Sequence, residues 1–282
     1  MKQVYIMTLY IGLAMLFMPQ AMAGGFAVNG VSASAMGVAD AVVAAADDVS
    51  AASYNPAGLA WQDGIQGMAG LKVQYRNSSS EITAGTASNR GSTGNLGHLY
   101  ASWMPHDSNL GVSLAYSRPF AVDNDWSSGL PAAGQTRIKA DRLSVDAIYS
   151  IGSSLAIAVG AEWYISSASL SQPGNVFNGN DKTAFGGHLS VKWKPAPMWS
   201  LGAMARMGAK LNLSGNANQT LDIQLPDELT VGVAYDLIDA VRLELDTTWS
   251  RWSKLTDLNV LSGTTLVQSN ALDMQDTFTI MV

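Results

Sequence analysis

The chain has 282 residues, of which 48% are hydrophobic and only 13% are charged, yet its mean hydropathy is just +0.11. Such values are expected when apolar and polar residues alternate along the chain instead of clustering. The formal net charge of −6 argues against nucleic acid as a partner, because proteins that bind nucleic acid carry clustered Lys and Arg. Since there is no cysteine, neither disulfides nor thiol chemistry contributes.

Residues 1–23 have the pattern of a secretory signal peptide. Lys2 supplies the positive start, an apolar core follows from Val4 to Phe17, and Ala21-Met22-Ala23 forms a small-x-small cleavage site. The segment is too short to span a membrane comfortably, since a spanning helix takes about 20 residues. We therefore predict export, cleavage after Ala23 and a mature start at Gly24.

Residues 24–62 differ from the rest of the chain because they are rich in Ala, Gly and Ser and poor in basic residues. Asp47 and Asp48 are predicted to close one short helix or cap the next. Asn55-Pro56 predicts a turn, because proline pushes the preceding residue out of the α region. This composition favours a compact plug of short helices, with a flexible N-terminal arm as the alternative.

Strict two-residue alternation follows. Every odd-numbered residue from Ile65 to Tyr75 is apolar or glycine, and the same period recurs at 155–165, 185–193 and 201–211. These lengths suit tilted strands that cross a bilayer, which take about 9–11 residues. About ten strands are predicted, near 65–77, 94–104, 109–119, 137–151, 154–166, 183–194, 199–212, 228–237, 240–252 and 276–282.

Charged residues of these segments lie opposite the apolar face. They are Lys72, Arg76, Glu162, His188, Lys192, Arg206, Lys210, Arg242, Glu244 and Asp246. A lipid-facing Lys or Arg at the bilayer midplane costs about 2–4 kcal/mol, so the charged face is predicted to line a lumen. A soluble sandwich would alternate too, but here long polar connections take turns with short ones such as GSS and PAPM, which is typical of bacterial outer-membrane barrels. We predict an all-β fold: an antiparallel transmembrane β-barrel over 63–282.

Three stretches carry a family resemblance. The first is GVSASAMGVADAVVAAADDVSAASYNPAGLAW, the second is SRPF followed by a loop with Trp126, and the third runs from Leu225 to Trp252. Together they resemble the FadL-type outer-membrane transporters of long-chain fatty acids and other hydrophobic compounds. The family's N-terminal hatch signature matches Gly37, Asp47, Asp48, Asn55, Pro56 and Ala57. The chain departs from it at Val38 and Val42, where the family often has a basic or aromatic residue and a second glycine.

The resemblance implies a fourteen-stranded barrel whose lumen is plugged by the small helical hatch of residues 24–62. It also implies a bacterial outer-membrane location, contact with outer-membrane lipid and the assembly machinery, a monomer, and lateral release of ligand into the membrane. About ten strands are visible, so we expect a C-terminally truncated member that lacks about four. A genuine ten-stranded barrel and a non-functional fragment are the alternatives.

The ligand implied by the resemblance is a hydrophobic small molecule, first of all a long-chain fatty acid whose carboxylate meets a lumen base. Candidate contact residues are Phe26, Lys72, Arg76, Trp126, Arg142, Arg206 and Lys210. The competing interpretation is that these cations only pair with Glu162, Glu244 and Asp246 and keep the lumen neutral.

Other functions have little support in the sequence. His98, His106 and His188 lack a nucleophile motif and metal-ligand spacing, so we expect no enzyme, metal or cofactor. A general diffusion porin and a loop-based adhesin or receptor remain open as alternatives.

Overall fold

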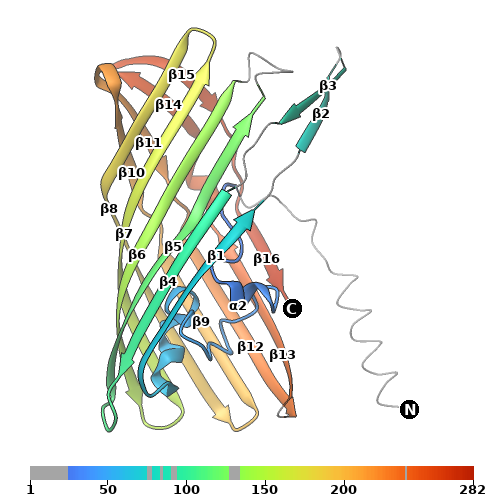
Figure 1. The fold of residues 1–282 in the computed structure, drawn as a ribbon, viewed down its shortest axis with the longest axis vertical. Coiled ribbons are helices and arrows are strands. Elements are labelled where there is room, and N and C mark those ends of the chain that lie inside the picture. Colours follow the sequence, from blue (N-terminus) through green and yellow to red (C-terminus); the bar gives the residue numbers. More distant parts are fainter. Residues whose placement is uncertain (1–24, 75–77, 83–84, 90–93, 127–133, 239) are drawn as a thin grey trace.

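The computed structural model describes residues 25–74, 78–82, 85–89, 94–126, 134–238 and 240–282. Tilted strands form a curved wall, and the short helices near the N-terminus lie inside its lower half (Figure 1). No helix in these ranges is long and apolar enough to cross a membrane.

One antiparallel sheet contains fourteen strand segments of the described chain. They are β1 (Gly64–Gln74), β4 (Gly94–Met104), β5 (Leu110–Asp125), β6 (Gln135–Ile151), β7 (Leu155–Gln172), β8 (Asn175–Ala196), β9 (Trp199–Met207), β10 (Lys210–Gly215), β11 (Gln219–Gln224), β12 (Glu228–Ile238), β13 (Val241–Ser250), β14 (Asp257–Ser262), β15 (Thr265–Ala271) and β16 (Thr277–Met281). A separate hairpin, β2 (Ser78–Ile82) with β3 (Gly85–Asn89), lies above β1. Short 3₁₀ turns occupy Asn216–Asn218 and Trp252–Lys254.

These segments make ten passes along the wall, because β9 continues into β10, β11 into β12, β13 into β14 and β15 into β16. This agrees with the ten strands predicted from the alternation. Within the described residues, β1 pairs only with β4, β15 only with β14 and β16 only with β13, so the sheet is open between these edges.

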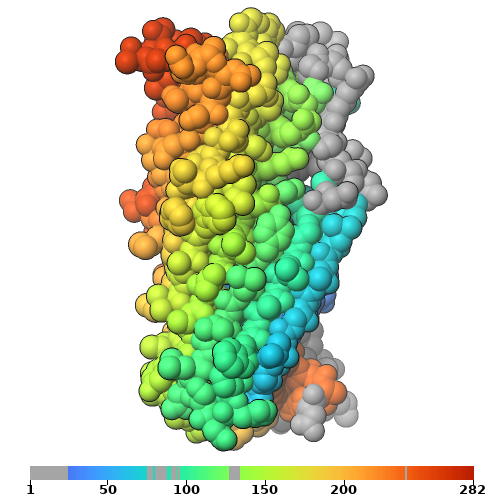
Figure 2. All heavy atoms as spheres, turned by 60° about the vertical axis from the view of Figure 1, so that its left-hand side comes forward, coloured from blue at the N-terminus to red at the C-terminus, as the bar shows by residue number. Residues whose placement is uncertain are grey.

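The outer face of the lower wall is apolar, as the alternation predicted. Ile65, Val159, Phe185 and Leu189 are among its large apolar side chains and are 58–83% exposed. Figure 2 shows the tilted strands side by side over this face. Exposed apolar area on this scale requires a hydrocarbon environment.

Several polar stretches expected as loops are strands. β7 and β8 continue through residues 167–181, β10 and β11 occupy much of 213–226, and β14 and β15 lie within 253–275. Beyond Ile165 the outward positions become polar, as at Ser167, whereas the inward Leu170 is 1% exposed. The strands therefore extend beyond the bilayer and keep an apolar inner face. Because their outer face is polar there, the pattern of apolar outward residues did not predict these extensions.

The predicted strand 199–212 is divided, and its faces exchange at the break. Met207 faces outward, whereas Leu211, on the same parity, is fully buried. Gly208 occupies the gap between β9 and β10, where its N–H donates to the Asp227 carboxylate at 2.9 Å. Lys210 consequently lies on the outside, where it pairs with Asp222 at 2.7 Å, and the lumen position expected for it is wrong.

Residues 25–62 form a compact hatch with helices α2 (Ala33–Met36) and α3 (Ala51–Tyr54) and the 3₁₀ helix η1 (Pro56–Trp61). Ala52, Ala57 and Leu59 are fully buried and pack against Tyr100 and Ile148 of the wall. The predicted plug of short helices is what the structure contains, and the flexible arm is not.

Candidate ligand cavity above the hatch

The inner wall carries its side chains in horizontal rows, because antiparallel register places inward residues of neighbouring strands side by side. Three rows cross β8, β9, β12, β13 and β16 in that order. The ionic row contains His188, Arg206, Glu228, Ser250 and Thr277; the hydroxyl row contains Ser190, Met204, Thr230, Thr248 and Thr279; the hatch row contains Lys192, Gly202, Gly232, Asp246 and Met281.

The hatch row and its neighbour Glu244 hold the loop 42–45 of the hatch. Two successive N–H groups, of Val42 and Val43, donate to Oδ2 of Asp246 at 2.8 Å. The next two, of Ala44 and Ala45, donate to Oε1 of Glu244 at 2.9 Å. Hydrogen bonds to charged acceptors are about twice as strong as neutral ones, so these two carboxylates latch the hatch to β13.

Glycines let the hatch backbone approach the wall this closely. A Cβ on Gly202 would lie 2.1 Å from the Val43 carbonyl oxygen, and a Cβ on Gly232 would lie 1.9 Å from Oδ1 of Asp246. Lys192 also contributes, because its Nζ donates to the Ala45 carbonyl.

The NPA motif fixes the other side of the hatch. The buried Asn55 amide donates to the carbonyls of Val43 at 2.7 Å and Val191 at 3.0 Å. Pro56 begins η1, where its missing N–H is not needed, and the N–H of Ala57 donates to Ser190 at 3.2 Å. The motif thus joins two hatch segments to β8.

An ionic cluster lies directly above the hatch. The carboxylate of Glu162, whose side chain is fully buried, accepts hydrogen bonds from Nε of Arg206 at 2.8 Å and Nδ1 of His188 at 2.9 Å, with Arg142 at 3.7 Å. Arg206 also pairs with Glu228 at 2.9 Å and donates to the Ser53 carbonyl of the hatch at 3.1 Å. All three nitrogens of that guanidinium are therefore occupied.

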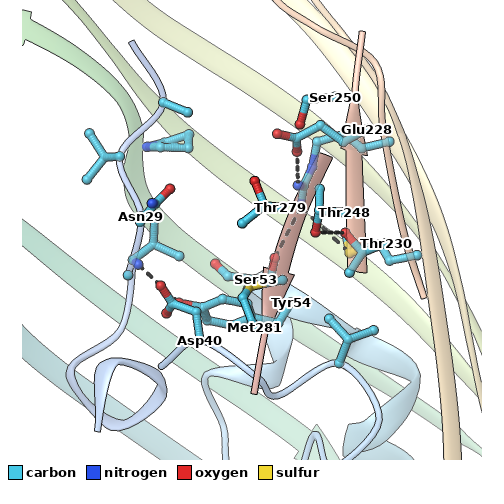
Figure 3. A pocket seen from close by; sticks show the side chains of 18 of the residues that line it. Asn29, Asp40, Ser53, Tyr54, Glu228, Thr230, Thr248, Ser250, Thr279 and Met281 are labelled. Atoms are coloured by element: carbon cyan, nitrogen blue, oxygen red, sulfur yellow. Dashed lines mark hydrogen bonds and ion pairs between the residues drawn. The ribbon is translucent and has the colours of Figure 1, made fainter. Parts of the chain in front are cut away.

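A cavity of about 160 Å³ lies between the N-terminal segment and β12, β13 and β16 (Figure 3). Apolar residues of its lining are Ala27, Val28, Pro119, Phe120 and Trp252; its polar wall on β12, β13 and β16 contains Thr230, Thr248, Ser250, Thr277 and Thr279; and the hatch contributes Asp40, Val43, Ser53 and Tyr54. Arg142, Arg206 and Glu228 of the ionic cluster also reach its surface. The cavity is therefore amphipathic.

Apolar side chains fill the lumen above this cavity. Phe26, Phe120 and Trp252 pack edge to face, with ring centroids 5.1–6.0 Å apart. Around them lie inward residues of the extended strands, including Ile138, Leu170, Phe177, Leu211, Leu221, Ile223 and Val260. The outer half of the described lumen is consequently a hydrophobic environment.

Asp40 is the acidic group on the cavity floor that belongs to the hatch. Burial raises the pKa of its carboxyl, and the hydrogen bond from the Tyr54 hydroxyl at 3.0 Å only partly opposes this. Burial and the neighbouring Asp40 carboxylate in turn raise the pKa of Tyr54. Tyr54 also accepts the N–H of Val31 at 3.0 Å, so it joins the two ends of the hatch.

The sequence profile of the family described as "Outer membrane protein transport protein (OMPP1/FadL/TodX)" matches residues 14–184. The chain belongs to the FadL/TodX family. No curated protein sequence matches the chain at a significant level. Membership places the chain in a family of outer-membrane transport proteins, as the sequence resemblance predicted.

Solved structures support the fold of this FadL/TodX family member. A Pseudomonas aeruginosa FadL homologue superposes with a TM-score of 0.71 at 16% sequence identity. The superposition covers 91% of this chain and 76% of the homologue. The Pseudomonas putida toluene transporter TodX gives 0.63 at 18% identity, covering 82% and 73%, and the Ralstonia pickettii toluene transporter TbuX gives 0.63 at 17%, covering 82% and 76%. At these identities the likeness shows the fold alone.

The structure places the predicted hatch residues of this family member as follows. Gly37 ends α2, Asp47 pairs with Arg242, and Asp48 accepts two hydrogen bonds from Ser50 at the start of α3. The N-cap of α3 is Ser50, which makes no side-chain capping bond, so Asp48 binds the N-cap residue and, contrary to the expectation from the sequence, does not cap the helix itself. Asn55, Pro56 and Ala57 contact the wall, as described above.

The predicted ligand contacts are only partly brought together. Arg142 and Arg206 line the cavity, and Phe26 belongs to the aromatic group beside it. Lys72 donates to the Asn29 carbonyl of the N-terminal segment. Lys210 faces outward, Trp126 lies half-buried at the end of β5, and Arg76 lies outside the described residues.

Sequence reasoning missed the polar wall of the cavity. Thr248 and Ser250 on β13, and Thr277 and Thr279 on β16, recur with the two-residue period of an inward face. That spacing was the available signal. Its meaning depended on the pairing of β13 with β16, which places Thr248 beside Thr279.

Proposed function

We propose that this FadL/TodX family member takes up small, neutral hydrophobic compounds through the bacterial outer membrane by passive diffusion. The observation that supports this best is the arrangement of the lumen: an apolar outer half leads to an amphipathic cavity above a latched hatch. Each buried CH₂ gains about 0.8 kcal/mol, so an apolar molecule partitions into such a lumen whereas a sugar does not.

The charges around the cavity favour a neutral ligand over a fatty-acid anion. Arg206 pairs with Glu228 at the cavity surface, and Arg142 and Arg206 both contact Glu162 behind it. A ligand carboxylate would have to displace Glu228 or Glu162 from the arginines and leave that acid without its partner, which is costly. The long-chain fatty acid remains the competing candidate.

The size of the cavity points to a compact ligand. An apolar cavity of about 150 Å³ binds benzene in another protein. The present cavity, at about 160 Å³, suits a single substituted aromatic ring better than an extended acyl chain. Two of the structural relatives are named as toluene transporters, which agrees with this size.

The pairing of β4 with β5 supports lateral release. Their described pairing runs from Trp103 with Val112 to Leu99 with Tyr116 and stops there. Above this point β5 carries Pro119, which has no N–H to donate, and the N-terminal segment pairs with β5 instead, through Ala27 and Phe120. A wall that separates beside the cavity offers a direct path into the bilayer, whereas the hatch blocks the axis.

Transport assays in cells test this proposal. The full chain is expressed in a host that lacks its own transporter of this family, and uptake of p-xylene, oleate and glucose is measured. We expect faster uptake of p-xylene only. Faster uptake of glucose would establish a general porin and overturn the proposal, and faster uptake of oleate without p-xylene would establish a fatty-acid transporter.

A further inference from the structure

The polar wall of the cavity consists of hydroxyl groups in a regular grid. Thr230, Thr248 and Thr279 form one row across three strands, and Ser250 and Thr277 lie beside each other in the row next to it. Figure 3 shows Thr230, Thr248 and Thr279 turned toward the cavity, opposite the N-terminal segment with Asn29. Five hydroxyls on one face give the wall many donors and acceptors but no charge.

Most of this hydrogen-bonding capacity is unused among the described residues. Thr230 and Thr248 share one bond of 2.9 Å, in which either oxygen is able to donate. The side chains of Ser250, Thr277 and Thr279 have no hydrogen bond to a described residue, although Ser250 is only 8% exposed and Thr277 only 4%. The oxygens of Ser250 and Thr277 are not enclosed, because they border the cavity, and Thr279 is exposed, so all three hydroxyls are open to a ligand or to water that bonds to them.

The apolar part of the lining favours a ligand whose remainder is apolar and flat. Phe120, Trp252 and Val28 also line the cavity, and Phe120 and Trp252 belong to the aromatic group above it. Aromatic side chains pack well against another ring in an edge-to-face arrangement. A suitable molecule therefore has an aromatic ring on one side and an uncharged hydroxyl on the other.

We propose that the cavity selects hydroxylated monoaromatic compounds, of the phenol and cresol class, over hydrocarbons of the same shape. This assignment rests on the proposed uptake function and names the substrate class of the same cavity. A hydrocarbon strips water from the hydroxyl grid and returns no bond, whereas the ligand hydroxyl both donates and accepts. Sites that bond a substrate hydroxyl discriminate strongly against the analogue that lacks it.

Two nearly isosteric ligands, p-cresol and p-xylene, test the assignment. Their binding to the purified full chain in detergent and their uptake by cells are compared for the unmodified protein, Thr248→Val, Thr279→Val and the double variant. Valine keeps the shape of threonine and removes the hydroxyl. We expect p-cresol to bind more tightly than p-xylene, and each substitution to weaken p-cresol by about tenfold, as for the loss of one hydrogen bond, without weakening p-xylene.

Matched controls separate the hydroxyl from other effects. Thr247→Val changes the neighbouring residue of β13, which points out of the cavity, and is expected to leave both ligands unaffected. Thr248→Ser keeps the hydroxyl and is expected to retain p-cresol binding, which a merely structural role of the side chain does not predict.

The outcomes also separate this assignment from the uptake function. Equal binding of p-cresol and p-xylene to the unmodified protein, or equal losses of both in the valine variants, would overturn the phenol assignment alone. If cells take up neither compound faster than the host without the chain, the uptake function itself fails. A preference for the anion p-toluate over p-cresol would show that the arginines, not the hydroxyls, choose the ligand.

Discussion

Gly232 and Asp246 lie directly opposite each other in the register of β12 and β13, and the Asp246 carboxylate occupies the space that a side chain on Gly232 would need. A Cβ there would be 1.9 Å from Oδ1, and also 3.2 Å from the backbone nitrogen of Ala44. The glycine in the wall and the carboxylate that holds the hatch thus depend on each other.

Gly232→Ala is therefore expected to displace Asp246 and release the hatch loop 42–45. Each N–H that loses its acceptor in a buried place costs about 1–3 kcal/mol, and Asp246 serves two of them. Hydrogen exchange of the amides of residues 42–45 should accelerate strongly. Gly67→Ala, on the outer face of β1, has no contact closer than 3.8 Å and should leave the exchange unchanged.

We expect substitution of Arg206 to lower the stability of the protein more than it lowers ligand binding. Arg206→Met leaves Glu162 buried without its closest guanidinium partner and removes the bond to Ser53 of the hatch, a change that costs about 3–5 kcal/mol for a buried ion pair. The folded, fast-migrating form on unheated gels should lose thermal stability. Adding Glu162→Gln should recover part of the loss.

A different result for Arg206 would support the fatty-acid interpretation. If Arg206→Met keeps the stability of the unmodified protein and loses oleate binding while p-xylene still binds, the arginine serves a ligand carboxylate. In that case the ion pairs of Arg206 with Glu162 and Glu228 contribute little to the stability of the fold.

Cross-linking across β4 and β5 tests the lateral route. The register of Leu99 with Tyr116, continued upward, sets His98 opposite Ser117, where the described strands are not paired. Because the chain has no cysteine, His98→Cys with Ser117→Cys introduces a unique pair for a short bismaleimide. Cross-linking should slow p-xylene uptake, since it holds the two strands together.

The control for this cross-link lies lower on the same two strands. Ala101 and Leu114 are paired in the structure, so linking cysteines at these positions fixes a contact that already exists. Uptake of p-xylene by this cross-linked control should stay unchanged. Unimpaired uptake in the His98 and Ser117 pair after complete cross-linking would argue for an axial path past the hatch.

Asp40 should make the docking of the hatch depend on pH. Its pKa is raised by burial above the ordinary value near 3.9, so the docked hatch favours the neutral carboxyl. Below about pH 4 the carboxyl of Asp40 is protonated and does not weaken the docking of the hatch. As the pH rises through the raised pKa of Asp40, the free energy of docking becomes less favourable. Asp40→Asn should remove this loss.

Hydrogen exchange of the hatch at pH 4 and pH 7, corrected for intrinsic rates, measures this effect. Protection in Asp40→Asn should exceed that of the unmodified protein at pH 7 and match it at pH 4. The exposed Asp63, which lies outside the hatch, provides the control substitution Asp63→Asn. Equal protection of Asp40→Asn and the unmodified protein at both values would exclude a role for this carboxyl.

The sequence by itself determined the architecture. The face of a strand that contacts the bilayer must be apolar, because a charge there costs free energy. The two-residue period around Ile65 or Val159 therefore predicted both the strands and their outer face. Asn55-Pro56 predicted a turn, because proline limits the backbone of the residue before it whatever lies around it, and the family resemblance assigned this turn to the hatch. These are local constraints, and local sequence expresses them.

Tertiary structure alone decided which inward residues meet. Glu162 contacts Arg206 from 44 positions away, and Val42 contacts Asp246 from 204 positions away. Thr248 and Thr279 form one wall only because β13 pairs with β16 in that register. The break at Gly208 also reversed the face of Lys210, since a single irregular residue exchanges inside and outside in a strand. The cavity depends on these pairings, which no period in the sequence encodes.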